Sequence, residues 1–83
     1  MIIYVGNLNY SISEEELNKV FSDFGTVESV KLIRDKMTGR LKGFGFVEMP
    51  DDNEAQTAIK ELDGKELMGR NMRVNPSRPP QPR

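Results

Sequence analysis

The most specific chemistry in this chain lies in the run from Lys42 to Met49, which reads Lys-Gly-Phe-Gly-Phe-Val-Glu-Met. Side chains alternate between the two faces of a β-strand, so Phe44 and Phe46 would share one face with Lys42, and Val47 would lie on the other. Two phenyl rings on a surface beside an ammonium group need a reason, because Phe is usually buried. Stacking of unpaired bases on the rings, with the ammonium group at a phosphate, is such a reason.

Hydrophobic patterning predicts the strands that would position these rings. Four segments are rich in β-branched and aromatic residues or alternate between apolar and polar positions: 2–8, 27–33, 42–49 and 72–75. In the first segment, Ile3 and Val5 would face the core and Tyr4 would face the opposite side.

Two further segments have the i, i+3, i+4, i+7 spacing of amphipathic helices, with apolar stripes that begin at Leu17 and at Ala55. Each is preceded by an N-terminal capping pair, in which a Ser or Asp is followed three residues later by Glu. Gly25 is expected to end the first helix as a left-handed cap, and Gly64 to end the second.

The predicted order is β-α-β-β-α-β, which is a ferredoxin-like α+β sandwich with a four-stranded antiparallel sheet. Right-handed crossovers place both helices on the same face of the sheet. The opposite face then stays open, and alternation places the following side chains on it: Tyr4, Lys31, Ile33, Phe44, Phe46, Arg73 and Asn75.

Length and composition exclude several classes of protein. Eighty-three residues make one small domain. The chain has no cysteine and no histidine, which excludes thiolate metal sites and Ser-His-Asp chemistry. No apolar run approaches the ~20 residues of a membrane span. We therefore expect a soluble, cytoplasmic, monomeric protein without a cofactor, a metal or an enzymatic activity.

The net charge of −1 hides an uneven distribution of charge. The predicted helices are acidic, with Glu14, Glu15, Glu16, Asp51, Asp52 and Glu54 among their residues and only Lys19 and Lys60 in return. Strands, loops and tail carry most of the basic residues. One side of the fold should therefore be acidic and the other basic, and the local field matters for binding more than the total charge.

The C-terminal residues 76–83 contain four of the five prolines and two arginines. This composition predicts an extended, flexible Pro/Arg-rich tail that follows a domain of residues 1–75. Two Pro-x-x-Pro matches in the tail are a minor alternative reading.

The Lys42–Met49 run resembles the ribonucleoprotein octamer of the RNA recognition motif (RRM) family. The hexamer Ile3–Leu8 resembles the second signature of that family, and both lie on the strands where the family has them. The likeness covers residues 2 to about 75, and the whole chain is similar to small single-domain RNA-binding proteins of bacteria. One departure is Met49, where the family has Phe or Tyr; by alternation this side chain faces the core, where Met packs well.

The resemblance implies that Tyr4 and Phe46 each stack on one base, that Phe44 packs against the sugars, and that Lys42 binds a phosphate. Strand geometry adds Lys31, Arg73 and Asn75 as contacts to base edges or phosphates. Basic residues of the loop and the tail could contact further phosphates: Arg34, Lys36, Arg40, Arg78 and Arg83.

The expected partner is single-stranded RNA, and binding of single-stranded DNA is left open. The alternative is a protein-protein interaction domain on the same fold that uses its acidic helical face. Tyr10 lies off the predicted surface and is interpreted as a packing residue of its loop.

Overall fold

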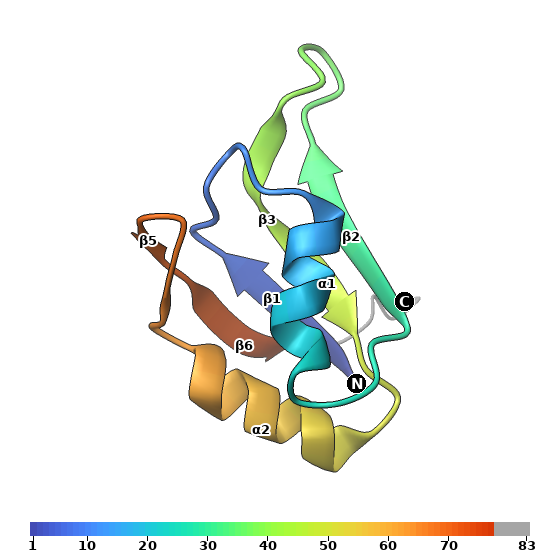
Figure 1. The fold of residues 1–83 in the computed structure, drawn as a ribbon. Helices are drawn as coiled ribbons and strands as arrows, with labels where there is room; N and C mark the ends of the chain where they lie inside the picture. Colours follow the sequence, from blue (N-terminus) through green and yellow to red (C-terminus); the bar gives the residue numbers. More distant parts are fainter. Residues whose placement is uncertain (78–83) are drawn as a thin grey trace.

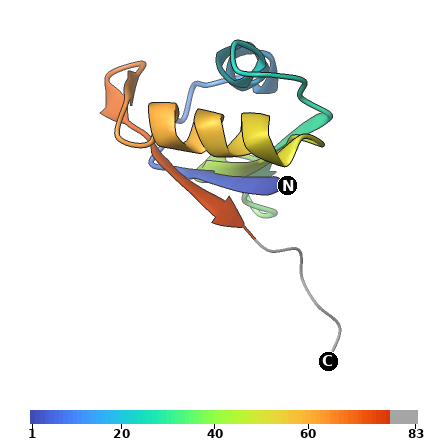
Figure 2. The ribbon, with the colours of Figure 1, turned by 90° about the horizontal axis from the view of Figure 1, so that it is seen from below.

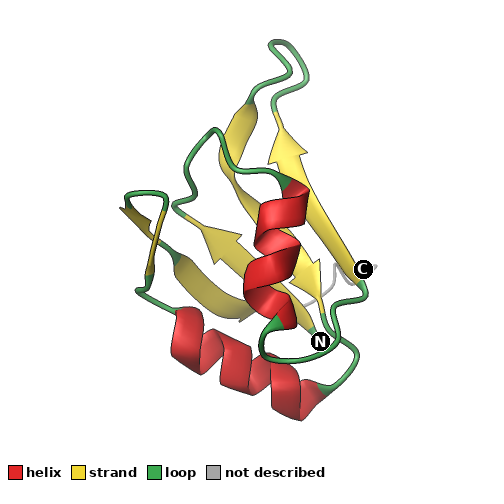
Figure 3. Ribbon diagram, viewed as in Figure 1, coloured by secondary structure: helices red, strands yellow, loops and turns green. Residues whose placement is uncertain are grey.

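The computed structural model describes residues 1–77, so the predicted contacts of Arg78 and Arg83 lie outside the described residues. The described residues form two helices and a main sheet, with a short hairpin at one side (Figure 3). In chain order the elements are β1 (Ile2–Gly6), α1 (Glu14–Ser22), β2 (Ser29–Arg34), β3 (Leu41–Glu48), α2 (Asp52–Leu62), β4 (Glu66–Leu67), β5 (Arg70–Asn71) and β6 (Arg73–Ser77).

The main sheet has the strand order β2-β3-β1-β6, and every neighbouring pair is antiparallel. Both helices lie across one face of this sheet (Figure 1), and the view from below shows both on the same side of the strands (Figure 2). The predicted α+β sandwich is thus confirmed. The β4–β5 hairpin is an addition to the predicted order, and Met68 and Gly69 form its two-residue turn.

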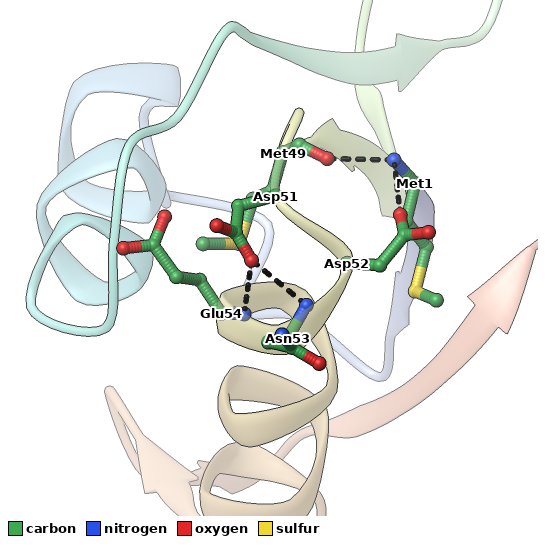
Figure 4. A network of polar contacts seen from close by, with 6 residues as sticks. All are labelled: Met1, Met49, Asp51, Asp52, Asn53 and Glu54. Atoms are coloured by element: carbon green, nitrogen blue, oxygen red, sulfur yellow. Dashed lines mark hydrogen bonds and ion pairs between the residues drawn. The ribbon is translucent and has the colours of Figure 1, made fainter.

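Both helices begin at the predicted caps. The Ser13 hydroxyl accepts a hydrogen bond from the Glu16 amide at 3.1 Å. The Asp51 carboxylate accepts from the amides of Asn53 and Glu54 at 2.9 and 3.0 Å (Figure 4). These bonds satisfy amides that have no partner within the helix.

The start of α2 also holds the N-terminal strand. The ammonium group of Met1 donates to the Met49 carbonyl at 2.6 Å and lies 3.5 Å from the Asp52 carboxylate (Figure 4). These contacts join β1 to the junction between β3 and α2.

The core lies between the sheet and the helices. Its largest side chain is Phe21 of α1, which is completely buried. Met49 is also completely buried, so its departure from the family pattern is a packing variant, as alternation predicted. The remaining buried apolar residues come from strands, helices and loops: Ile3, Val5, Leu8, Ile12, Leu17, Leu32, Val47, Ala55, Ala58, Leu62, Met72 and Val74.

Each edge strand of the sheet donates one outward amide to a carboxylate of the helical layer. The Leu32 amide of β2 donates to Glu14 at 3.4 Å, and the Val74 amide of β6 donates to Asp63 at 3.1 Å. Unpaired strand edges can recruit further strands. These carboxylates occupy one position on each edge, where another strand could otherwise pair.

Helix α1 ends earlier than predicted. Asp23 is its C-cap in a right-handed conformation, and its amide donates to the Phe21 carbonyl, so the expectation that Gly25 is a left-handed cap was wrong. Gly25 instead lies against the side chain of Glu54, whose carboxylate accepts from the Thr26 amide at 3.2 Å. The space that this carboxylate fills is what requires a glycine.

The last strand is longer than predicted. Pro76 and Ser77, which the sequence assigned to the tail, pair with Ile3 and Ile2 in β6. Proline fits there because β6 is an edge strand, where one missing amide donor is tolerated. No helix among residues 1–77 has the length and apolar character needed to cross a membrane.

Candidate nucleic-acid interface

Four side chains form one row across the uncovered face of the sheet. Phe46 of β3 lies opposite Tyr4 of β1 and opposite Lys31 of β2, and Tyr4 lies opposite Asn75 of β6. Directly opposed residues of antiparallel strands point to the same face. The sheet register therefore brings together four predicted site residues from four different strands.

Three aromatic rings lie at the centre of this face, and we call Tyr4, Phe44 and Phe46 the aromatic platform. The ring centroid of Tyr4 is 6.0 Å from those of both Phe44 and Phe46, and the two phenyl rings are 6.3 Å apart. The pairs are tilted or edge-on, with interplanar angles of 32°, 65° and 90°. Because no pair is stacked face to face, the rings do not cover one another's faces.

All three rings are half-buried. Val47, on the other face of β3, is completely buried. The alternation of exposure along β3 is the one predicted from the sequence. Ile33 is also half-buried, but the register shifts between Leu32 and Arg34, so the pairing of β2 with β3 is irregular at this end of the platform.

At two glycines of the sheet, neighbouring atoms lie where a Cβ atom would be. A Cβ atom at Gly6 would lie 2.5 Å from the Tyr4 hydroxyl oxygen and 2.9 Å from the ring atom Cε1, so the Tyr4 ring rests over Gly6. A Cβ atom at Gly45 would overlap the Lys31 carbonyl oxygen, a backbone atom of the neighbouring strand. Gly6 thus positions a ring, whereas Gly45 lets β2 and β3 approach each other.

Three basic side chains and one amide side chain come from β3 and from the two edge strands of the sheet. Lys31, Lys42, Arg73 and Asn75 are exposed, and Arg73 lies opposite Gly6 at the β6 side. Within residues 1–77, no carboxylate forms an ion pair with any of these three cations.

A second group of cations lies on the loop between β2 and β3, which we call the β2–β3 loop (residues 35–40). Its residues Lys36 and Arg40 are exposed, and so is Arg34 at the end of β2. The Arg34 guanidinium donates to the Gly39 carbonyl at 3.4 Å.

Asp35 organises this loop. Its carboxylate accepts hydrogen bonds from the amides of Met37 at 2.7 Å and Thr38 at 3.3 Å. These two backbone bonds, the Met37 bond foremost, hold the pKa of Asp35 below its usual value, and the nearby Lys42 charge acts in the same direction. The charged form of Asp35 therefore stabilises the turn.

The lowered pKa gives a pH dependence with a definite sign. A carboxyl group whose pKa is lower in the folded state stabilises that state above its unfolded pKa of about 4, and this contribution is lost as the pH falls through the folded value. We expect the amide NMR signals of Met37 and Thr38 to titrate together below pH ~4. Asp35→Asn should abolish that titration, and a midpoint at or above the usual Asp value would contradict the assignment.

One part of this region was not predicted from the sequence: the contact between the β1–α1 loop and the β4–β5 hairpin. Asn7 donates to the Asn71 carbonyl at 2.7 Å and accepts from Arg70 at 3.2 Å, and Asn9 donates to the Met68 carbonyl at 3.0 Å. These partners are about sixty residues apart in the chain. No local pattern in the sequence indicates such a contact.

In the part of the chain that the structure describes, no three acidic side chains gather to hold a metal ion, and no polar side-chain atom is buried without a partner. The interface consists of flat rings, amide and hydroxyl groups, and exposed cations.

These observations define a ferredoxin-like sandwich with an open, aromatic sheet face. The family model of the RNA recognition motif matches residues 3–73. The chain therefore belongs to the RNA recognition motif family, as the two signature segments indicated. Members of this family are non-enzymatic, in agreement with the expected absence of catalysis.

Individual relatives agree with this assignment. A protein of Nostoc sp. (strain PCC 7120), named as a candidate RNA-binding protein RbpB, is 54% identical over 79 residues, which cover 95% of this chain and 77% of that protein. The crystal structure of RNA-binding protein PG1 has a TM-score of 0.90 at 49% identity and covers 96% of this chain and 99% of that one. The structure of the Rna15 RRM with bound RNA (GU) has a TM-score of 0.82 at 32% identity, over 92% and 81% of the two chains.

Proposed function

We propose that this protein binds a short segment of single-stranded RNA on the open face of its sheet. Family membership and the relatives named as RNA-binding support this function. The single observation that carries the mechanism is the aromatic platform, in which three half-buried rings meet on the face that the helices leave uncovered.

In this mechanism Tyr4 and Phe46 each stack on one base, and Phe44 packs against the sugars between them. A stack on an aromatic ring is worth about 1–3 kcal/mol and tolerates any base, because every base has a π face. The stacking contacts alone therefore give affinity with modest sequence preference.

Polar and basic residues supply the remaining contacts. Asn75 and Lys31 lie at the two ends of the row that contains Tyr4 and Phe46, where they can reach base edges. Lys42 and Arg73 contact phosphates at the borders of the platform. Further phosphate contacts come from the basic end of β2 and its loop, through Arg34, Lys36 and Arg40.

A titration followed by amide NMR shifts tests the proposal. Addition of mixed-sequence single-stranded RNA oligomers should shift the amides of β1 and β3 and leave the outer surface of α2 unchanged. An absence of shifts on the sheet would refute RNA binding by the platform. Shifts confined to the helices on addition of a protein partner would instead favour a protein-interaction domain.

Lys42→Ala should weaken RNA binding chiefly through the loss of one phosphate contact. Each phosphate contact to single-stranded nucleic acid contributes about 0.7 to the slope of log affinity against log salt concentration. We therefore expect the slope to become shallower by about that amount. The matched control is Lys19→Ala, an exposed lysine of α1 on the helical side, which should leave the slope unchanged. Equal slopes for the two variants would show that Lys42 makes no phosphate contact.

Gly6→Ala should displace the Tyr4 ring while the sheet remains folded. The new methyl group would overlap the ring atoms that now lie over Gly6, so the ring must turn away. We expect a loss of RNA affinity close to that of Tyr4→Ala, about 1–3 kcal/mol. A double-mutant cycle checks the cause: with Ala at position 6, removal of the Tyr4 ring should cost little more. Additive losses would show that Gly6 acts by another route.

A further inference from the structure

One acidic side chain shares the open face of the sheet with the aromatic platform. Glu48 is the last residue of β3 and follows Phe46 by two positions, so its side chain points to the same face as the Phe46 ring. It is only partly buried, and no cation of residues 1–77 forms an ion pair with it. A negative charge on this face repels the phosphates of a bound RNA, and neither the stacking contacts nor the phosphate contacts make use of it.

The sheet register places Glu48 in a second row of side chains, next to the row that contains Phe46. Glu48 lies opposite Ile2 of β1 and opposite Ser29 of β2, and these three strands lie side by side in Figure 1. Two residues along a strand span about 6.8 Å. A purine that stacks on Phe46 extends beyond the phenyl ring, so one edge of the base comes within reach of Glu48.

Ser29 adds a hydroxyl group beside this carboxylate. Its Oγ donates to Oε2 of Glu48 at 3.5 Å, which is long for a hydrogen bond between two oxygens. Ser29 is exposed, so its hydroxyl can turn to another acceptor and give up only a weak bond. The Glu28 amide donates to the Glu48 carbonyl at 2.7 Å and fixes the backbone at this point. The pair therefore presents two acceptor oxygens and one donor from a fixed position.

Among the four RNA bases, guanine alone has an edge that matches this set. Its Watson–Crick edge carries two neighbouring donors, N1–H and the 2-amino group, followed by the acceptor O6. Adenine and cytosine each offer one amino group beside a ring acceptor, and uracil offers one N–H between two acceptors. A carboxylate can accept two parallel N–H bonds from guanine only, and unpaired bases in RNA are read on this edge.

The charges on the open face are separated along the strands. Lys42 lies near the start of β3, whereas Glu48 lies at its end. Arg73 is opposite Gly6, the last residue of β1, and because β1 is antiparallel to β3 this places Arg73 toward the Lys42 end of the sheet. Phosphates are therefore favoured at one end of the platform, and an uncharged base edge is favoured at the Glu48 end.

We propose that Glu48 and Ser29 form a guanine-reading site for the base that stacks on Phe46. The Glu48 carboxylate accepts from N1–H and from the 2-amino group, and the Ser29 hydroxyl donates to O6. These hydrogen bonds offset the repulsion between the carboxylate and the phosphates. The site rests on the proposed RNA-binding function and deepens it, because it gives a base preference to a platform whose stacking contacts tolerate any base.

Three hexanucleotide probes test the site by binding titration. One is all uridine, and the other two carry a single central guanosine or inosine, which the protein can bring onto Phe46 by choice of register. We expect the guanosine probe to bind about tenfold more tightly than the all-uridine probe. Inosine keeps N1–H and O6 but lacks the 2-amino group, so its probe should have an intermediate affinity.

Glu48→Gln should change the affinities for two of these probes in opposite directions. Glutamine has one acceptor and one donor, so it cannot accept both bonds from guanine, and the guanosine probe should bind severalfold more weakly. The all-uridine probe should bind slightly more tightly, because a charge that repels phosphates is gone. Ser29→Ala should reduce the guanosine preference by a smaller factor, since it removes only the donor to O6.

The controls separate base reading from charge and from the platform itself. Glu61→Gln removes an exposed carboxylate of α2 on the helical side and should leave the guanosine preference intact. Phe46→Ala should weaken all three probes, and if it weakened none, RNA binding by the platform would be refuted. Equal affinities of the original protein for the guanosine and all-uridine probes would overturn the guanine site. So would a full guanosine preference in Glu48→Gln while Phe46→Ala still weakens binding.

Discussion

Phe46→Ala and Tyr4→Ala should each weaken the binding of single-stranded RNA by about 1–3 kcal/mol while the domain stays folded. Phe46 is the residue that links the row on the sheet, with Tyr4 opposite on one side and Lys31 on the other. Its removal deletes one stacking surface and also the edge-on neighbour of both other rings. The double variant should lose at least as much as either single variant and approach the affinity of simple electrostatic binding.

The measurement is a binding titration at fixed salt concentration, together with thermal unfolding of each variant. Loss of one ring should lower the free energy of unfolding by only about 1 kcal/mol, because the rings are half-buried and lie outside the core. Phe24→Ala is a suitable control, since it removes a half-buried phenyl ring on the helical side of the sheet. If Phe24→Ala weakened RNA binding as strongly as the two platform variants, the effect would arise from destabilisation and the platform would lose its support.

Phe21→Ala should instead affect folding, with a loss of about 3–5 kcal/mol in the free energy of unfolding. Phe21 is the largest completely buried side chain and packs α1 against the sheet. Its truncation removes apolar contacts and leaves a cavity that the short helix cannot fill by relaxing. In a domain whose total stability is typically about 5–15 kcal/mol, this loss is a large fraction.

Urea unfolding followed by circular dichroism measures this effect. Phe24→Ala, three residues further along the chain and only partly buried, should cost clearly less. RNA binding by Phe21→Ala should fall only in proportion to the unfolded fraction and recover at low temperature or in a stabilising osmolyte. A stability close to that of the original protein would mean that Phe21 is not the anchor of the core.

The different expectations for Phe21 and Phe46 follow from patterns that the sequence contains. Phe21 belongs to an apolar stripe with helical spacing, whereas Phe46 alternates with Val47 in a strand that already has a core face. The same residue type therefore has two roles, and the period of its neighbours distinguishes them. The element order, the two caps and the aromatic platform were all predictable in this way.

The boundaries and the additional contacts were not predictable by the same reasoning. Helix α1 ends at Asp23, and the Glu54 side chain from α2 occupies the space beside Gly25. Pro76 continues β6, because β1 offers it a partner and the strand lies at the edge. Both outcomes depend on segments that are remote in the chain.

The sequence by itself determined the β-α-β-β-α-β order and the face on which the three rings lie, because periodicity and alternation are local properties of the chain. Only the tertiary structure decided how the rings are spaced, that the Tyr4 ring rests over Gly6, and that Ser29 lies beside Glu48 on the open face. These features depend on strand register and loop packing between residues that are far apart in the sequence. A local pattern cannot encode such distances, since they are set only when the sheet and the helices pack together.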